Sequence, residues 1–148
     1  MSQAGLDVAA VRAAIGVAVD GQWLGAPWPA SVRWRSAGWS SALLSPPSVV
    51  VGLPTITYDS VGCGEHQIEV EVHAVLPGDP TSRETSDLWD RAASRGLTGS
   101  VVDLLEADPT LGGVVDTLSV LSVEPTNALS AQGSTLSVVT INLDIRAS

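Results

Sequence analysis

Three glutamates in one short segment are the residues most able to perform chemistry together. Glu65, Glu69 and Glu71 lie within residues 65–76, where apolar and polar residues alternate. Paired carboxylates carry out acid–base chemistry when burial separates their pKa values. Strict alternation instead predicts a half-buried β-strand whose polar side faces solvent. We therefore expect a solvated strand face here, and the alternatives are an acidic surface with an electrostatic role and a catalytic or metal site.

A cysteine and a histidine three residues apart form the second candidate site. Cys63 lies between two glycines in a turn, and His66 follows at the start of the next strand. A cysteine nucleophile also needs an orienting group for its base, and the sequence offers only this one nearby histidine. With one cysteine and two histidines, neither an intrachain disulfide nor a Cys/His zinc site is expected. We predict no enzyme, no metal and no cofactor, and keep an enzymatic domain that uses Cys63 and His66 as an alternative.

Residues 20–47 contain four of the five tryptophans, together with prolines and glycines that disfavour long regular elements. An irregular segment of this length inside a compact domain is usually functional. Tryptophan is enriched at protein interfaces. This makes Trp28, Trp34 and Trp39 candidates for a subunit or partner interface. The alternative is that the indoles pack on the sheet as a lid over the core.

The remaining segments must position these residues. Apolar spacings of three and four predict helices, the second of which is capped by Asp79 or Thr81. The predicted helices cover residues 7–19, about 80–94 and about 99–107. The predicted strands cover residues 32–35, 49–58 with a break near Gly52 to Pro54, 65–76, 114–123 and 134–145, with a loop over 124–133. This order predicts an α+β fold, in which an antiparallel sheet of two hairpins carries helices on one face, in a single domain over residues 1–148.

The charge of the chain is unevenly distributed. Seven basic residues face sixteen acidic ones, for a net charge of −9. Residues 1–47 hold three arginines and two aspartates, a net of +1, and residues 48–148 hold four arginines and fourteen acids, a net of −10. Nucleic-acid-binding surfaces need clustered arginine and lysine, so such a surface is not expected. No apolar run long enough for a membrane span occurs and no signal peptide is evident, so we expect a soluble intracellular protein.

Two structural motifs carry a resemblance to a known family. The first is Val49-Val-Val-Gly-Leu-Pro-Thr-Ile-Thr-Tyr-Asp59, which leads into a hairpin. The second is Gly99-Ser-Val-Val-Asp-Leu-Leu-Glu-Ala-Asp-Pro-Thr-Leu-Gly-Gly113, which precedes the last strands. With the N-terminal helix and the Trp- and Pro-containing segment, they resemble the tail terminator proteins of long-tailed (siphovirus) bacteriophages. The resemblance covers residues 6–146 and is strongest over 47–59 and 97–116.

The resemblance implies a structural virion protein at the head-proximal end of the tail, assembled in the host bacterial cytoplasm. Such a protein forms a homohexameric ring on the tail tube protein, ends tube polymerisation and joins the tail to head-completion proteins. Genomic DNA would pass through the lumen without specific binding, and no membrane is involved. Glu65, Glu69 and Glu71 would then face the lumen and repel DNA phosphates. The alternatives are a head-completion or stopper protein, another neck-ring protein, and a bacterial binding module without a viral role.

Overall fold

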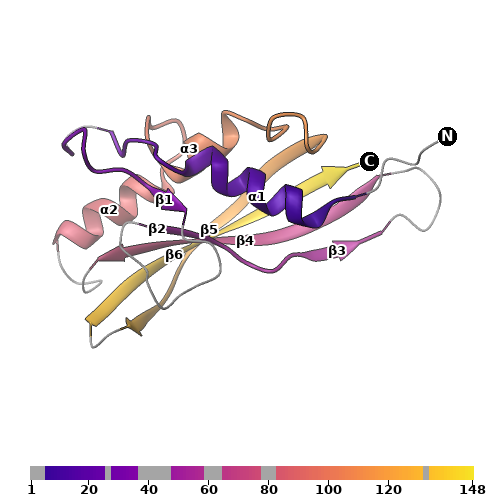
Figure 1. Ribbon diagram of the computed structural model, residues 1–148. Helices are drawn as coiled ribbons and strands as arrows, with labels where there is room; N and C mark the ends of the chain where they lie inside the picture. Colours follow the sequence, from indigo (N-terminus) through magenta and orange to yellow (C-terminus); the bar gives the residue numbers. More distant parts are fainter. Residues whose placement is uncertain (1–5, 26–27, 37–47, 59–64, 78–82, 132–133) are drawn as a thin grey trace.

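The computed structural model describes residues 6–25, 28–36, 48–58, 65–77, 83–131 and 134–148 (Figure 1). These residues form a single six-stranded sheet and three helices. The helices are α1 (Val8–Val19), α2 (Arg83–Ala93) and α3 (Val101–Glu106). The strands are β1 (Arg35–Ser36), β2 (Ser48–Val51), β3 (Thr55–Thr57), β4 (His66–Pro77), β5 (Thr117–Ala131) and β6 (Ser134–Ala147). The α+β fold expected from the sequence is confirmed.

The sheet is built around the two long central strands. The strand order is β1-β2-β4-β6-β5, and β3 follows β2 along the same edge of β4. Strand β4 pairs with β6 from His66 opposite Ala147 to Pro77 opposite Leu136. All neighbouring strands are antiparallel except β1 and β2, which are parallel. The two predicted hairpins, β2 and β3 with β4 and β5 with β6, are therefore both present.

The predicted break in the first long strand is confirmed. The main-chain N–H of Gly52 donates to the Glu71 carbonyl at 2.7 Å, and the next strand begins only at Thr55. A Cβ atom at Gly52 would lie 2.9 Å from that same carbonyl oxygen, so a larger residue would push the strands apart. Pro54 cannot donate to a ladder. These two residues divide one predicted strand into β2 and β3.

The predicted loop over residues 124–133 is wrong. Strand β5 continues to Ala131 in register with β6, with irregularities between Val120 and Ser122 and between Thr126 and Leu129. Pro125 lies within this strand opposite Val139, because proline is tolerated in an edge strand where its missing N–H faces away from the sheet. The β-bulges then restore the register that the hairpin needs.

The helix predictions agree with the structure where it is described. Asp7 caps α1 by accepting from the N–H of Ala10 at 3.1 Å, and Ser100 caps α3 by accepting from Asp103 at 2.9 Å. After α2, Gly96 has a φ of +74°, as its role at the helix end requires. The predicted cap residues Asp79 and Thr81 lie outside the described residues.

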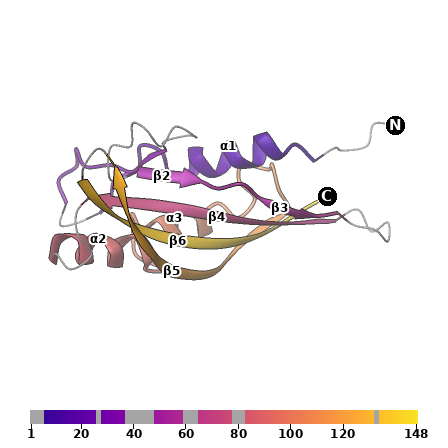
Figure 2. The same ribbon diagram turned by 90° about the horizontal axis from the view of Figure 1, so that it is seen from below.

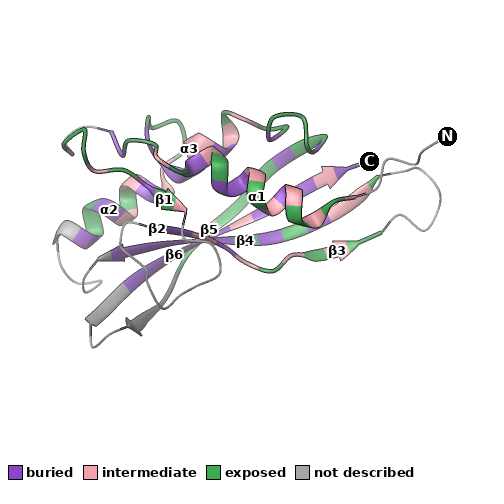
Figure 3. Ribbon diagram, viewed as in Figure 1, coloured by how far each residue is buried: buried purple, intermediate pink, exposed green. Residues whose placement is uncertain are grey.

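The described helices cover one side of the sheet, which is the side that forms the core. Figure 1 shows α1 and α3 on this side, and Figure 2 views the molecule from below, where the sheet is nearer the viewer. Figure 3 shows buried and exposed residues alternating along the central strands. The apolar side chains that point to the helices form one buried cluster. Its central members are Val11, Ile15, Trp34, Ile68, Val70, Val72, Leu88, Leu105, Ile141, Leu143 and Ile145.

The described residues between α1 and β1 are irregular but are firmly attached to the turn that precedes α3. The indole N–H of Trp34 donates to the Gly99 carbonyl at 2.7 Å, and the Trp34 side chain is fully buried. The main chain of Trp34 is also bonded on both sides, to Gly21 and to Gln22. Gly99 has a φ of +89°, and a Cβ atom there would lie 2.6 Å from the Trp23 carbonyl oxygen. A side chain at position 99 would therefore separate the two segments.

Gly99→Ala and Gly112→Ala form a matched test of this attachment. Both glycines have positive φ, which costs an alanine about 1–2 kcal/mol. A Cβ atom at Gly112 would have open space around it, whereas Gly99 abuts the main chain of residues 23 and 24. We expect Gly99→Ala to lower the urea midpoint of unfolding clearly more than Gly112→Ala does. Equal midpoints would contradict the close approach.

Candidate assembly surfaces

The three glutamates singled out from the sequence lie on the side of the sheet opposite the described helices. This side is open at the glutamates, whereas Val75 and Val138 are buried farther along the same face of β4 and β6. Glu65 precedes β4, while Glu69 and Glu71 alternate with its buried residues, and all three side chains are exposed. The expected solvated strand face is therefore confirmed. We call this side of β4, β6 and β5 the acidic face.

Like charges stand directly opposite each other on the acidic face. Glu69 of β4 is paired in register with Asp144 of β6. The side-chain amide of Gln67 donates to both carboxylates, at 3.2 Å to Glu69 and 3.0 Å to Asp144. Two like charges at directly opposed positions destabilise a sheet. The shared amide, and the Arg146 guanidinium 3.3 Å from Asp144, relieve part of this repulsion.

Further carboxylates continue the acidic face onto β5. Glu124 accepts from the Asn142 side-chain amide at 3.2 Å, and Asn142 also donates to Ser122 at 2.9 Å. Arg146 contacts Asp144 at 3.3 Å and Glu65 at 3.9 Å. The described carboxylates of this face are Glu65, Glu69, Glu71, Glu124 and Asp144. They outnumber the arginine on the same face five to one, so the face is strongly negative.

The acidic face is hollowed. A depression of about 550 Å³ is lined by residues of the four strands β3, β4, β6 and β5, with Glu69, Glu71 and Asn142 among them. Leu53, at the β2–β3 break, and Leu121, on β5, also line it and are 76% and 63% exposed. The hollow thus has a polar floor and an exposed leucine toward each edge of the sheet.

For Trp34, the prediction that it lies at a subunit or partner interface is wrong. Its side chain is fully buried and belongs to the core, so it cannot contact another subunit while the chain is folded. Trp28 is half-buried, and the guanidinium of Arg91 lies 5.3 Å from its ring centre. Trp39 lies outside the described residues. Trp23, which sequence reasoning did not select, is 38% exposed, and its indole donates to the carbonyls of residues 28 and 29.

The Cys63–His66 interpretation stays a prediction, because Cys63 lies outside the described residues. The His66 ring packs edge-on against Tyr58, with ring centres 5.2 Å apart. His73, on the acidic face, lies 3.1 Å from the Thr140 hydroxyl and 3.6 Å from Glu71. In the described part of the chain, no group of three or more histidine, cysteine, aspartate or glutamate side chains is placed to hold a metal ion. Among the same residues, no helix is long and apolar enough to cross a membrane.

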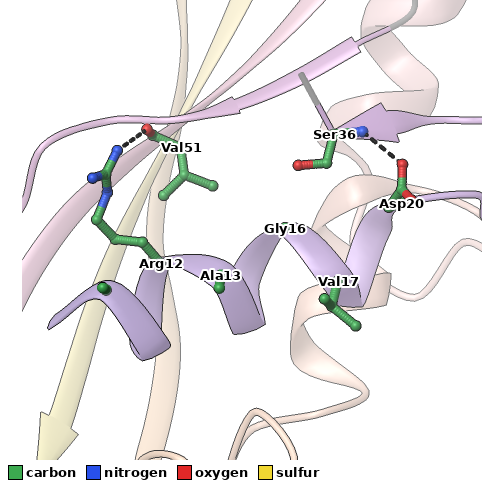
Figure 4. Close-up of a pocket in the computed structure, with 8 residues that line it drawn as sticks. Arg12, Ala13, Gly16, Val17, Asp20, Ser36 and Val51 are labelled. Carbon is green, nitrogen blue, oxygen red and sulfur yellow. Dashed lines mark hydrogen bonds between the residues drawn. The ribbon is translucent and has the colours of Figure 1, made fainter. Parts of the chain in front are cut away.

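A groove along α1 is the surface that sequence reasoning missed (Figure 4). It has a volume of about 490 Å³ and lies between α1 and strands β1 and β2. Arg12 donates to the Val51 carbonyl at 3.1 Å, and Asp20 accepts from the Ser36 N–H at 2.9 Å. The remaining lining residues of the helix are small or apolar. They are Ala9, Ala13, Gly16 and Val17.

The sequence does contain a signal for this groove. The small residues Ala9, Ala13 and Gly16 recur at helical spacing on the side of α1 that faces β1 and β2. Gly16 is required by packing, because a Cβ atom there would lie 2.7 Å from the Ser36 hydroxyl oxygen. The close approach of β1 to α1 leaves the groove as a shallow channel at the edge of the sheet.

A scan of known protein families finds none that matches this chain, and no curated protein matches it.

Glu69→Gln tests the repulsion on the acidic face. Removing one of two opposed charges should raise the urea midpoint at low salt, by a few tenths of a kcal/mol in unfolding free energy. The gain should shrink in high salt, because exposed charges are screened. Glu106→Gln is the control of opposite sign, since Glu106 pairs with Arg95 at 2.8 Å. A Glu69→Gln variant that is destabilised like Glu106→Gln would contradict the repulsion.

Proposed function

We propose that the protein is a structural virion subunit that forms a ring at the head-proximal end of a phage tail tube. The ring ends polymerisation of the tube and joins the tail to head-completion proteins. The proposal rests on the family resemblance of residues 6–146. The observation on the molecule that supports it most is the uncovered, hollowed acidic face. The closest alternative remains a stopper or other ring protein of the head–tail connector.

The acidic face has the charge that a DNA passage needs. Duplex DNA carries one negative charge per about 1.7 Å of its axis, so cationic walls hold it through phosphate contacts. A wall with five carboxylates against one arginine repels phosphates instead. Glu65, Glu69 and Glu71 would face the lumen of the ring. A role in repelling DNA would explain why the chain has the opposed carboxylates Glu69 and Asp144, although their repulsion disfavours folding.

The edges of the sheet also suit a ring. Among the described strands, β5 is terminal and runs for fifteen residues, and β1 is terminal on the other side. A long open edge strand invites pairing with another chain. In a closed ring with head-to-tail interfaces, one edge of each subunit contacts the other edge of its neighbour. No edge of the sheet is then left exposed.

The direct test is binding to purified tail tubes. We expect the protein to bind at one end of each tube and to stop its elongation by added tube protein, as seen in negative-stain images. Binding along the whole tube, or no binding, would contradict the terminator role. Binding to portal-bearing heads in place of tubes would favour the stopper alternative.

The double variant Glu69→Lys/Glu71→Lys tests the lumen assignment. It converts the floor of the hollow from repelling to attracting phosphates, so tails should assemble at normal length while DNA ejection in vitro becomes slower. Asp87→Lys/Asp90→Lys is the matched control, since it makes the same charge change on α2, away from the acidic face. Equal ejection rates for the two variants would contradict a lumen-facing acidic face.

A further inference from the structure

The two terminal edges of the sheet differ in charge. Beside the α1 groove, residues 6–36 hold Arg12, Arg33 and Arg35 against two aspartates, a net of +1. On the opposite side, α3 packs against β5, and residues 95–124 hold Arg95 against five acids, a net of −4. The acids are Asp103, Glu106, Asp108, Asp116 and Glu124. One edge is therefore weakly basic and the other strongly acidic.

Both edges also carry exposed apolar side chains. On the groove side, Val17 is 74% exposed and Leu53 is 76% exposed. On the β5 side, Leu121 is 63% exposed and Val114 is 43% exposed. Scattered exposed apolar residues are normal on a protein surface. These four side chains, however, lie at the two ends of one sheet and beside opposite charges. That pattern is expected of two surfaces that bind each other.

The groove edge has the shape to receive a strand edge. Its floor is the side of α1 that faces β1 and β2, where the side chains of Ala9 and Ala13 are short, and Val51 of β2 closes its other side. The main-chain carbonyl of Val51 points into this region, since Arg12 of α1 donates to it. A neighbouring chain can thus approach the end of the sheet closely.

We propose that the β5 edge of one copy docks against the α1–β2 groove edge of a second copy. This inference rests on the proposed ring and names the surfaces that close it. We assign a second copy of the chain to the groove edge. The β5 edge of that copy has the opposite charge and carries its own exposed apolar residues, Leu121 and Val114. Steering by opposite charges favours this head-to-tail arrangement over pairing of like edges. Docking at the edges reaches the acidic face only at its two rims, where Leu53 and Leu121 line the hollow.

Two variants each disable one edge. Val17→Glu/Arg35→Glu places negative charge on the groove edge, and Asp116→Arg/Leu121→Arg places positive charge on the β5 edge. All four side chains are exposed, so both variants should keep the unfolding midpoint of the natural chain. Asp87→Arg/Asp90→Asn on α2 changes the net charge by the same amount as Asp116→Arg/Leu121→Arg and is the control away from both edges. Sedimentation equilibrium at low salt measures association of each protein.

The natural chain and the control should self-associate, and each edge variant alone should associate at least about tenfold more weakly. A mixture of the two edge variants should associate again. Its intact edges still fit each other, and its two altered edges now carry opposite charges. A natural chain that stays monomeric at about 1 mM, edge variants that associate normally, or a mixture without dimer would overturn the inference.

The failure of the tail role is distinguishable from the failure of this inference. Rings that form through the two edges but do not bind tail tubes would remove the terminator function and leave the edge pairing intact. Tube binding by edge variants that no longer self-associate would support the tail role and overturn the pairing.

Discussion

The hydrogen bond from the Trp34 indole to the Gly99 carbonyl is the interaction on which the rest of the structure depends. It joins segments 65 residues apart and fixes the irregular chain between α1 and β1 to the turn that starts α3. Through this contact the helix layer is tied together, because α1 leads into the Trp34 segment and α3 follows Gly99. A buried indole N–H without an acceptor would be costly. Glycine is required at position 99 by its φ of +89° and by the close main chain of residues 23 and 24, and the hydrogen bond holds the chain after α1 against the turn before α3.

That constraint places all the described helices on one side, and charged side chains dominate the open part of the other side. An antiparallel sheet with one solvated face is common, but opposed carboxylates on that face are unfavourable for folding. Glu69 and Asp144 face each other across β4 and β6, with Gln67 donating to both. Most buried apolar side chains lie on the covered side, while Val75 and Val138 form a small second cluster on the other side. The acidic face is then available for a role that depends on charge, and the unlike edges beside it are available for assembly.

Much of the fold could be predicted from the sequence because local chemistry determines it. Alternation in β4, the break at Gly52 and Pro54, and the capping of α1 by Asp7 each have a local signal. The extension of β5 through Pro125 could not be predicted, because whether a proline ends a strand depends on whether that strand is at an edge. The position of Trp34 in the core could not be predicted for a similar reason. Composition shows that tryptophans are concentrated in residues 20–47, but only the partner at Gly99 shows which of them is in the core.

The central claim is that copies of this chain form a closed ring with their acidic faces inward. Electron cryo-microscopy of the protein bound at the end of a tail tube tests it most directly, because side-chain density reports the direction of β4. The account predicts a closed ring in which Glu65, Glu69 and Glu71 point into the lumen. A ring in which these three side chains point outward, or tube ends occupied by isolated single copies, would contradict it.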